Sequence, residues 1–267
     1  MSYISLKSGT DIRGVASPLG GKEVNLTGEA VYDITAAFVS WYINKYDKDP
    51  SKLTISVGRD SRITGEKIAK QVISALINAG ISVIDCGLCS TPAMFMTTVD
   101  LKADAAIQIT ASHHPFDRNG LKFFTKDGGL DAPDIEEILL AAQEERVPAD
   151  AAGGRRVSCD HMTTYAAHLR DIICRGVNAE DYEYPLKGFK IAVDAGNGAG
   201  GFYATEVLAP LGADVSGSRY LEPDGHFPNH IPNPEDETAM RSICEAVRES
   251  GSDLGVIFDT DVDRGGA

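Results

Sequence analysis

Short apolar runs alternate with amphipathic segments along this chain. In the first half, the apolar runs are rich in Val and Ile and lie before polar loops, which predicts buried strands. The segments between them repeat apolar side chains at helical spacing. Thr27 is placed to cap the first helix, and Gly80 is placed to end the second in the left-handed conformation. The pattern predicts strands at 53–57, 81–84 and 105–109, and helices at 28–43, at 64–79, from Pro92 and from Pro133.

The second half repeats this rhythm. Residues 148–156 are rich in Gly and poor in large apolar side chains, so we place one domain at 1–150 and another at 157–267. Strands that alternate with helices imply parallel pairing and right-handed crossovers. The predicted fold class is α/β: two consecutive domains, each a mostly parallel sheet flanked by helices, with active-site loops at strand carboxyl ends. In the second domain we expect strands at 189–194, 213–218 and 254–258, and helices at 201–211 and 235–250.

Composition argues against several classes of protein. With 267 residues, of which 43% are apolar, the chain is long enough for two globular domains. It has no run of about 18 apolar residues, and its first residues lack the apolar core of a signal peptide, so we expect no membrane span and no export. Five scattered cysteines fit a reducing, cytoplasmic setting. A net charge of −14 argues against nucleic acid as a partner.

The first loop with candidate chemistry follows the apolar run 105–109. It reads Thr-Ala-Ser-His-His-Pro at 110–115, and Lys122 follows shortly afterwards. A serine hydroxyl needs an adjacent base or a metal to act as a nucleophile, and His113 lies next to Ser112. We interpret Ser112 as a catalytic hydroxyl rather than a simple turn residue, and His114 as a residue that shapes the loop.

The second such loop follows the apolar run 254–258. Asp259, Asp261 and Asp263 stand at alternate positions, which point to the same side in an extended segment. Three crowded carboxylates are costly without a cation, and carboxylate oxygens suit Mg²⁺. A hydroxyl, a bound cation and Arg264 are together the groups that phosphoryl transfer uses.

Five further motifs accompany these two loops. In order along the chain, the whole series resembles the α-D-phosphohexomutases, the phosphoglucomutase/phosphomannomutase superfamily. The resemblance extends over nearly the whole chain, and the order of the motifs makes it specific. The additional motifs are Ser8–Gly14, Val57–Arg62, Asn119–Lys122, Val193–Gly200 and Pro223–Glu235.

The resemblance implies an enzyme that interconverts a hexose 1-phosphate and a hexose 6-phosphate, of glucose or mannose, through a phosphoserine at Ser112 and a bisphosphorylated sugar. The partners would be the hexose phosphate and the hexose bisphosphate. Catalytic roles would fall to Ser112, His113, Lys122 and Arg13. Phosphate or substrate contacts would come from Thr10, Arg13, Arg59, Lys122 and Arg264. The resemblance also implies a Mg²⁺ ion held by Asp259, Asp261, Asp263 and an oxygen of phosphorylated Ser112.

The chain departs from the family pattern in three places. His114 stands where the family often has Asn, and Thr260 and Val262 stand where Gly is common. These changes affect the choice of subfamily more than the chemistry. The family's third and fourth domains do not occur within the 267 residues. We therefore expect the first half of a longer protein, one that folds but does not turn over substrate by itself.

Other functions stay open at this point. Residues 258–262 also fit an aspartyl-phosphate phosphatase, in which Asp259 would be the nucleophile. A non-catalytic sugar-phosphate-binding module is the third hypothesis. Gly196, Gly198 and Gly201 form a weak dinucleotide-binding pattern. The sequence does not distinguish glucose, mannose and N-acetylglucosamine phosphates, and it carries no signal of an oligomeric state.

Overall fold

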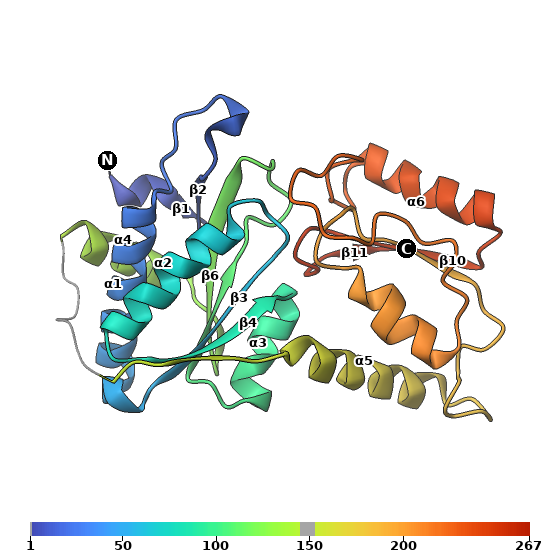
Figure 1. Cartoon of the computed structure of the whole chain (residues 1–267), viewed down its shortest axis with the longest axis horizontal. Helices are drawn as coiled ribbons and strands as arrows, with labels where there is room; N and C mark the ends of the chain where they lie inside the picture. The colour runs from blue at the N-terminus through green and yellow to red at the C-terminus, as the bar shows by residue number, and fades with distance from the viewer. Residues whose placement is uncertain (1, 145–152) are drawn as a thin grey trace. The chain divides into compact units, whose positions relative to one another are not determined.

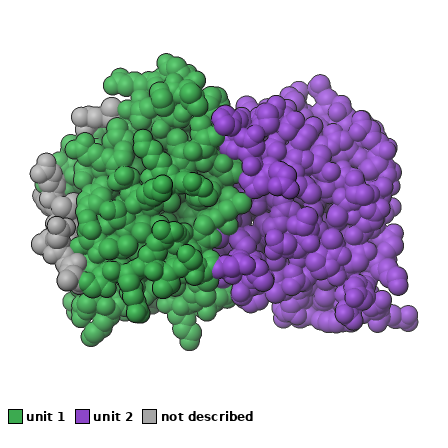
Figure 2. Space-filling model, viewed as in Figure 1, with its two compact units in different colours: residues 1–88, 94–159 green, residues 89–93, 160–267 purple. Residues whose placement is uncertain are grey.

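The chain forms two units, which a computed structural model describes over residues 2–144 and 153–267 (Figure 2). Unit 1 consists of the residues up to Leu88 together with Met94–Cys159, and unit 2 of Cys89–Ala93 and Asp160–Ala267. Part of the predicted boundary at 148–156 lies outside the described residues. The strand at its end, β8 (Arg156–Ser158), pairs with β4 (Ser82–Leu88) and so belongs to unit 1.

The sheet of unit 1 joins a parallel part to an antiparallel part. Its strand order is β1-β2-β6-β5-β3-β4-β8, and β7 pairs with β6. The four neighbouring strands β5, β3, β4 and β8 run parallel, as the alternation with helices predicts. On the other side of β5, the strands β6, β2 and β1 are each antiparallel to the strand before them. The remaining bounds are β1 (Lys7–Ser8), β2 (Asp11–Val15), β3 (Thr54–Arg59), β5 (Ala105–Ile109), β6 (Arg118–Thr125) and β7 (Gly128–Gly129).

The segment around Asn119-Gly120 is a strand, although this pair of residues is typical of a turn that closes a loop. It begins β6, between β5 and β2. A side chain at Gly120 would place its Cβ 2.1 Å from the carbonyl oxygen of Ile12. Position 120 therefore requires glycine because β2 passes so close to it, and not because the chain turns there. The sequence alone does not distinguish these two reasons for a glycine.

Three helices cover one face of this sheet, and Figure 1 shows α1, α2 and α4 on that face. Their apolar stripes form the main core with the strands, and Phe38 stacks on Phe123 at a ring distance of 4.4 Å. Thr27 caps α1 by accepting a hydrogen bond from the amide of Ala30, and Gly80 has a φ of +80°, so both predictions are confirmed. The bounds are α1 (Gly28–Tyr46), α2 (Gly65–Asn78), α3 (Thr91–Asp100) and α4 (Ala132–Gln143), with short 3-10 turns at Tyr3–Leu6, Pro18–Gly20 and Pro50–Lys52.

Unit 2 contains a three-stranded sheet in the order β11-β10-β9, with β9 and β10 parallel. The predicted strand at 213–218 is wrong: the segment makes only isolated bridges at Asp214 and Arg219. The predicted helix at 201–211 is a π-helical turn followed by a 3-10 turn, and α5 was not predicted. The bounds are α5 (His161–Val177), β9 (Ile191–Asp194), the π turn Tyr203–Leu208, the 3-10 turn Ala209–Leu211, α6 (Glu237–Ser250), β10 (Leu254–Phe258) and β11 (Gly265–Gly266).

None of the helices in the described ranges has both the length and the apolar character that a bilayer crossing requires.

Candidate active site

Ser112 lies in the loop that follows β5, as the sequence predicts, in a constrained backbone conformation. Its φ is +50°, a left-handed conformation that few residues other than glycine adopt. Its amide donates to the hydroxyl of Thr110 at 2.9 Å, and the residue is only 3% exposed. The loop therefore fixes the serine, and such strain is often found at functional positions.

A buried arginine holds this loop. The side chain of Arg62 is fully buried and donates hydrogen bonds to the carbonyl oxygens of Ser112, His114 (2.6 Å), Pro115 (2.7 Å) and Arg118 (2.9 Å). Its Nε lies 3.3 Å from a carboxylate oxygen of Asp60. The sequence placed Arg62 in a site motif but assigned it no role. The planar guanidinium explains why an arginine suits this position, because its five N–H groups can serve several carbonyl oxygens at once.

Asp11 connects the two cations that sequence analysis assigned to catalysis. Arg13, on β2, donates to Asp11 at 2.7 Å, and the ammonium of Lys122, on β6, lies 4.0 Å from the same carboxylate oxygen. Sequence analysis missed Asp11, although it lies in the same motif as Arg13. The carboxylate offsets part of the charge on both cations and fixes their positions.

The two histidines of the loop have different environments. The Nδ1 atom of His113 lies 3.5 Å from the Ser112 hydroxyl, at the outer limit of a hydrogen bond. Burial, together with the positive charges of Arg13, Arg118, His113 and Arg62, lowers the pKa of His114 to about 4. His114 is therefore neutral near pH 7. Burial is the larger cause, and the neighbouring arginines make the surroundings of the loop locally positive in a chain whose net charge is −14.

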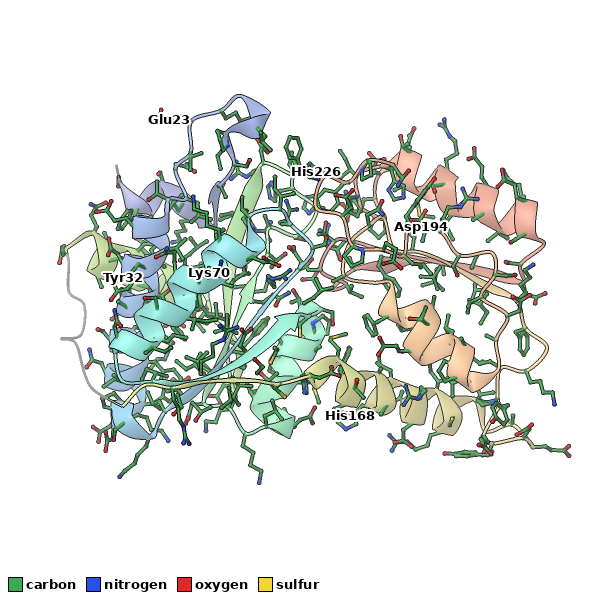
Figure 3. All side chains as sticks on the ribbon, in the orientation of Figure 1. Glu23, Tyr32, Lys70, His168, Asp194 and His226 are labelled. Atoms are coloured by element: carbon green, nitrogen blue, oxygen red, sulfur yellow. The ribbon has the colours of Figure 1, made fainter. Side chains whose placement is uncertain are left out.

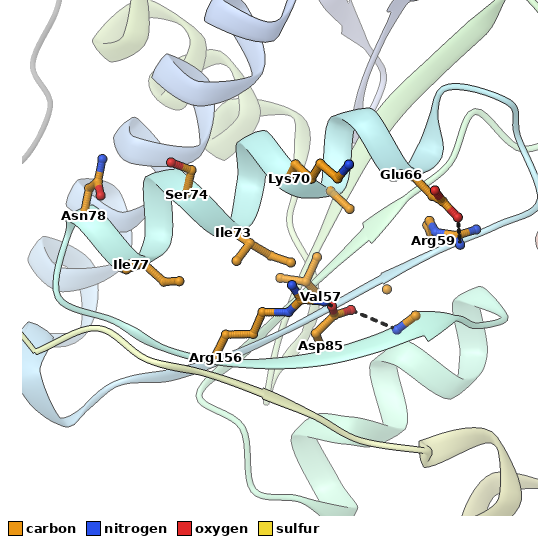
Figure 4. Close-up of a pocket in the computed structure, with 13 residues that line it drawn as sticks. Val57, Arg59, Glu66, Lys70, Ile73, Ser74, Ile77, Asn78, Asp85 and Arg156 are labelled. Carbon is orange, nitrogen blue, oxygen red and sulfur yellow. Dashed lines mark hydrogen bonds and ion pairs between the residues drawn. The ribbon is translucent and has the colours of Figure 1, made fainter.

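Two other predicted phosphate ligands also belong to unit 1. Thr10 is exposed in the turn between β1 and β2. Arg59, at the end of β3, pairs with Glu66 of α2 at 2.8 Å, and both line a cavity of about 550 Å³ beside α2 (Figure 4). Asp85 and Arg156, which also line it, form a second ion pair. Arg59 and Arg62 thus have different surroundings although they are three residues apart.

The three aspartates of the second loop converge. One carboxylate oxygen of each of Asp259, Asp261 and Asp263 lies within 4.8 Å of the others. The sequence predicted an extended segment, and this prediction is wrong, because the segment forms a tight turn. The amide of Val262 donates to the carbonyl of Asp259, and Val262 has a φ of +66°. Convergence thus depends on a left-handed residue rather than on strand alternation, and a β-branched side chain is rare in that conformation.

The environment of this cluster suits a cation. Both Asp259 and Asp261 are fully buried, and the Oδ1 atom of Asp261 has no hydrogen-bond partner among the described residues. Burial and the charges of Asp261 and Asp263 raise the pKa of Asp259 to about 8. Buried carboxylates that repel one another and present an orphaned oxygen match the donor set that Mg²⁺ prefers.

Both oxygens of Asp259 are already engaged. Its Oδ1 accepts from the amides of Asp263 and Arg264, each at 3.1 Å, and its Oδ2 accepts from the guanidinium of Arg264 at 3.0 and 3.2 Å. Arg264 also approaches Asp263 at 3.8 Å. The structure thus places Arg264 on two carboxylates of this cluster.

The glycine pattern at 196–201 supports this loop. A Cβ at Gly198 would lie 2.7 Å from the carbonyl oxygen of Thr260, and one at Gly201 would lie 2.1 Å from that of Leu221. Close packing within unit 2 therefore accounts for both glycines without a dinucleotide. Asp194, labelled in Figure 3, ends β9 just before them and accepts hydrogen bonds from His230 (3.0 Å) and Ser242 (2.6 Å).

Fold and loops together define an α/β protein with a strand-end serine in a cationic setting and a strand-end carboxylate cluster. Residues 6–147 match the family model for phosphoglucomutase/phosphomannomutase, alpha/beta/alpha domain I, and residues 163–267 match the model for domain II. The chain belongs to the phosphoglucomutase/phosphomannomutase family.

Individual relatives agree with this assignment. The chain is 34% identical over 261 residues to a phosphoglucosamine mutase of Bifidobacterium animalis subsp. lactis, covering 96% of this chain and 54% of the relative. It is 30% identical over 256 residues to a phosphomannomutase/phosphoglucomutase of Pseudomonas putida, covering 96% and 50%. A crystal structure of a phosphoglucomutase/phosphomannomutase family protein from Burkholderia thailandensis superimposes with a TM-score of 0.81 at 26% identity, covering 100% of this chain and 55% of that one. The chain thus spans about half the length of these relatives.

Proposed function

We propose that this chain carries the phosphoserine and metal loops of a phosphohexomutase, which interconverts hexose 1-phosphate and hexose 6-phosphate through a bisphosphorylated sugar. The observation that carries the proposal is the setting of Ser112. A hydroxyl fixed at a strand end lies in a loop held by the buried guanidinium of Arg62. Burial, together with the charges of Arg13, Arg118 and Arg62, lowers the pKa of His114 in that loop to about 4. Such a positive surrounding suits a phosphate group, which carries close to two negative charges.

The proton balance of the transfer suggests roles for two side chains. The bond between phosphorus and the Ser112 oxygen breaks, a bond to a sugar hydroxyl oxygen forms, and the proton of that hydroxyl ends on the serine. His113, with its Nδ1 atom 3.5 Å from the Ser112 oxygen, is placed to deliver that proton. Lys122 is the candidate for receiving the proton from the sugar, and Arg13 for holding a phosphate.

We further propose that Asp259, Asp261 and Asp263 hold Mg²⁺, with an oxygen of phosphorylated Ser112 completing the ligand set. The ion would supply positive charge that offsets the charge developing on the transferred phosphoryl group. Arg264 holds Asp259 in place for this purpose through two guanidinium bonds. Thr10 and Arg59 remain candidates for contacts with the substrate.

The environment of Asp259 argues against the rival phosphatase function. An aspartate nucleophile must present a carboxylate oxygen to the phosphorus atom. Asp259 is fully buried, and both of its oxygens accept hydrogen bonds within the loop. Carboxylates that bind a metal commonly keep such hydrogen bonds, whereas a nucleophilic oxygen has to be open to the phosphorus atom. We therefore favour Ser112 as the phosphorylated residue.

Phosphate transfer to the protein tests the proposal. The chain is incubated with glucose 1,6-bisphosphate or mannose 1,6-bisphosphate and Mg²⁺, and the modified peptide is identified by mass spectrometry. We expect label on Ser112, its loss in Ser112→Ala, and its retention in Ser61→Ala, a control that removes a hydroxyl from the loop after β3. Label on Asp259 would establish the phosphatase chemistry, and binding of the sugar phosphate without label would support a non-catalytic module.

A further inference from the structure

A threonine far away in the sequence contacts the proposed metal loop. Thr91 and Asp261 both belong to unit 2 and lie 170 positions apart. The Thr91 hydroxyl donates to Oδ2 of Asp261 at 2.5 Å, and the Thr91 amide donates to the carbonyl oxygen of Asp261 at 2.8 Å. Both residues are buried. Thr91 therefore holds Asp261 by its backbone and by its carboxylate at the same time.

The start of α3 explains why Thr91 is available for these bonds. The Ser90 hydroxyl accepts from the amide of Ala93 at 3.3 Å, which places Thr91 in the first turn of the helix. Amides in the first turn have no acceptor within the helix, and Pro92 has no amide hydrogen at all. The Thr91 amide consequently bonds outside the helix, and the positive helix end favours a negative carboxylate beside it.

The contact leaves one defined oxygen of Asp261 for a cation. The Oδ2 atom is engaged by Thr91, whereas Oδ1 is buried without a hydrogen-bond partner among the described residues. A carboxylate held at one oxygen cannot rotate freely, so the other oxygen keeps a fixed position. Groups that hold metal ligands in this way commonly affect metal affinity strongly.

We infer that Thr91 is a positioning residue for the metal site, which orients Asp261 so that its second oxygen binds the cation. The inference rests on the metal site of the proposed function and assigns Thr91 no contact with the ion. Without the hydroxyl, Oδ2 of Asp261 would be a buried acceptor without this donor, and the carboxylate could turn away from the orientation that presents Oδ1 to the cation.

Metal affinity tests the inference without any assay of activity. The probe is Mn²⁺, which prefers the same oxygen ligands as Mg²⁺. Its free concentration is followed by electron paramagnetic resonance during titration of the 267-residue chain. We expect Thr91→Val, which keeps the shape and removes the hydroxyl, to weaken binding about 10-fold or more. Thr91→Ser should restore affinity close to that of the unmodified chain.

A second threonine of the same helix provides the control. Thr98 is also buried, but its hydroxyl donates to the carbonyl oxygen of Phe95 within α3. Thr98→Val should leave Mn²⁺ affinity unchanged. Equal affinities for Thr91→Val and the unmodified chain would overturn the inference, as would an equal loss in Thr98→Val. If Thr91→Val does not fold, Thr91→Ala is measured in the same titration, with the same expected loss.

Failure of the inference and failure of the metal site give different results. If the unmodified chain binds no Mn²⁺, both the inference and the metal site in the proposed function are wrong. If the unmodified chain binds Mn²⁺ and the valine variant binds it equally well, only the role of Thr91 is wrong.

Discussion

Replacing Arg62 should release the Ser112 loop and destabilise unit 1. The side chain is completely buried, pairs with Asp60 at 3.3 Å, and donates to four carbonyl oxygens between Ser112 and Arg118. Arg62→Met keeps much of the apolar volume but removes the charge and every donor. The variant removes the guanidinium beside the buried Asp60 carboxylate, which keeps the backbone amide of residue 62 as a donor. It also removes a donor from each of the four carbonyl oxygens, of which that of Pro115 still accepts from the amide of Arg118.

The size of the effect follows from these contacts. Removing one partner of a buried ion pair costs about 3–5 kcal/mol, and a single hydrogen bond to a charged group contributes about 1.5–3 kcal/mol. When the arginine is lost, some of the carbonyl oxygens can accept hydrogen bonds from water instead. We therefore expect a loss of about 3–5 kcal/mol, as for a broken buried ion pair, rather than the sum over all the hydrogen bonds. The stability of Arg62→Lys should fall between that of Arg62→Met and that of the unmodified chain. An ammonium keeps the positive charge but cannot donate to four carbonyl oxygens at once.

Unfolding in denaturant measures the loss. The sequence contains a single tryptophan, Trp41, which is 5% exposed in α1 and whose fluorescence reports on unit 1. Arg59→Met is the matched control: it removes an arginine three residues away whose partner, Glu66, has a side chain that is 74% exposed. A pair of that kind contributes about 0–1 kcal/mol.

The comparison between the two arginines decides whether the reasoning is correct. We expect Arg62→Met to cost at least 2 kcal/mol more than Arg59→Met, roughly the difference between a buried and a surface pair. Hydrogen exchange at amides 110–118 should also become faster in Arg62→Met only. If the two variants lose equal stability, Arg62 is not what holds the loop.

Two further predictions concern unit 2. Val262 has a φ of +66°, where a β-branched side chain costs about 1–3 kcal/mol, so Val262→Gly should raise the thermal stability of unit 2 by roughly 1 kcal/mol in calorimetry. A lower melting temperature would show that the valine is not strained. Burial would lower the pKa of His230, but its bonds to Asp194 and to the carbonyl of Ile231 outweigh burial and raise that pKa above the ordinary 6.5. A raised pKa contributes stability that is complete below pH 6.5 and is lost as the pH rises through the pKa of the folded state. The free energy of unfolding of the unmodified chain should therefore exceed that of His230→Gln by less as the pH rises. Denaturation followed by circular dichroism measures this difference. An advantage that does not change with pH would contradict a protonated His230.

The sequence by itself determined the local elements and the chemistry of the loops. The stripes of α1, α2, α4 and α6 and the apolar runs of β3, β5 and β10 lie where the periodicity predicted them. Periodicity works there because each element buries one face, and the burial depends on neighbours a few residues apart. Ser112 and the three aspartates were recognisable because their residue types and order are themselves the signal.

Tertiary structure alone decided which of these residues meet. Arg59 and Arg62 belong to one short motif, yet one pairs with an exposed glutamate and the other holds the Ser112 loop. The aspartates converge through a left-handed valine rather than through an extended segment, and Thr91 reaches Asp261 from 170 positions away. β6 joins the sheet antiparallel although Asn119-Gly120 is typical of a turn. Arg62, Thr91 and β6 have partners distant in sequence, and local spacing carries no information about such partners. The turn of the aspartates is local, but it depends on a backbone conformation that the residue types do not indicate.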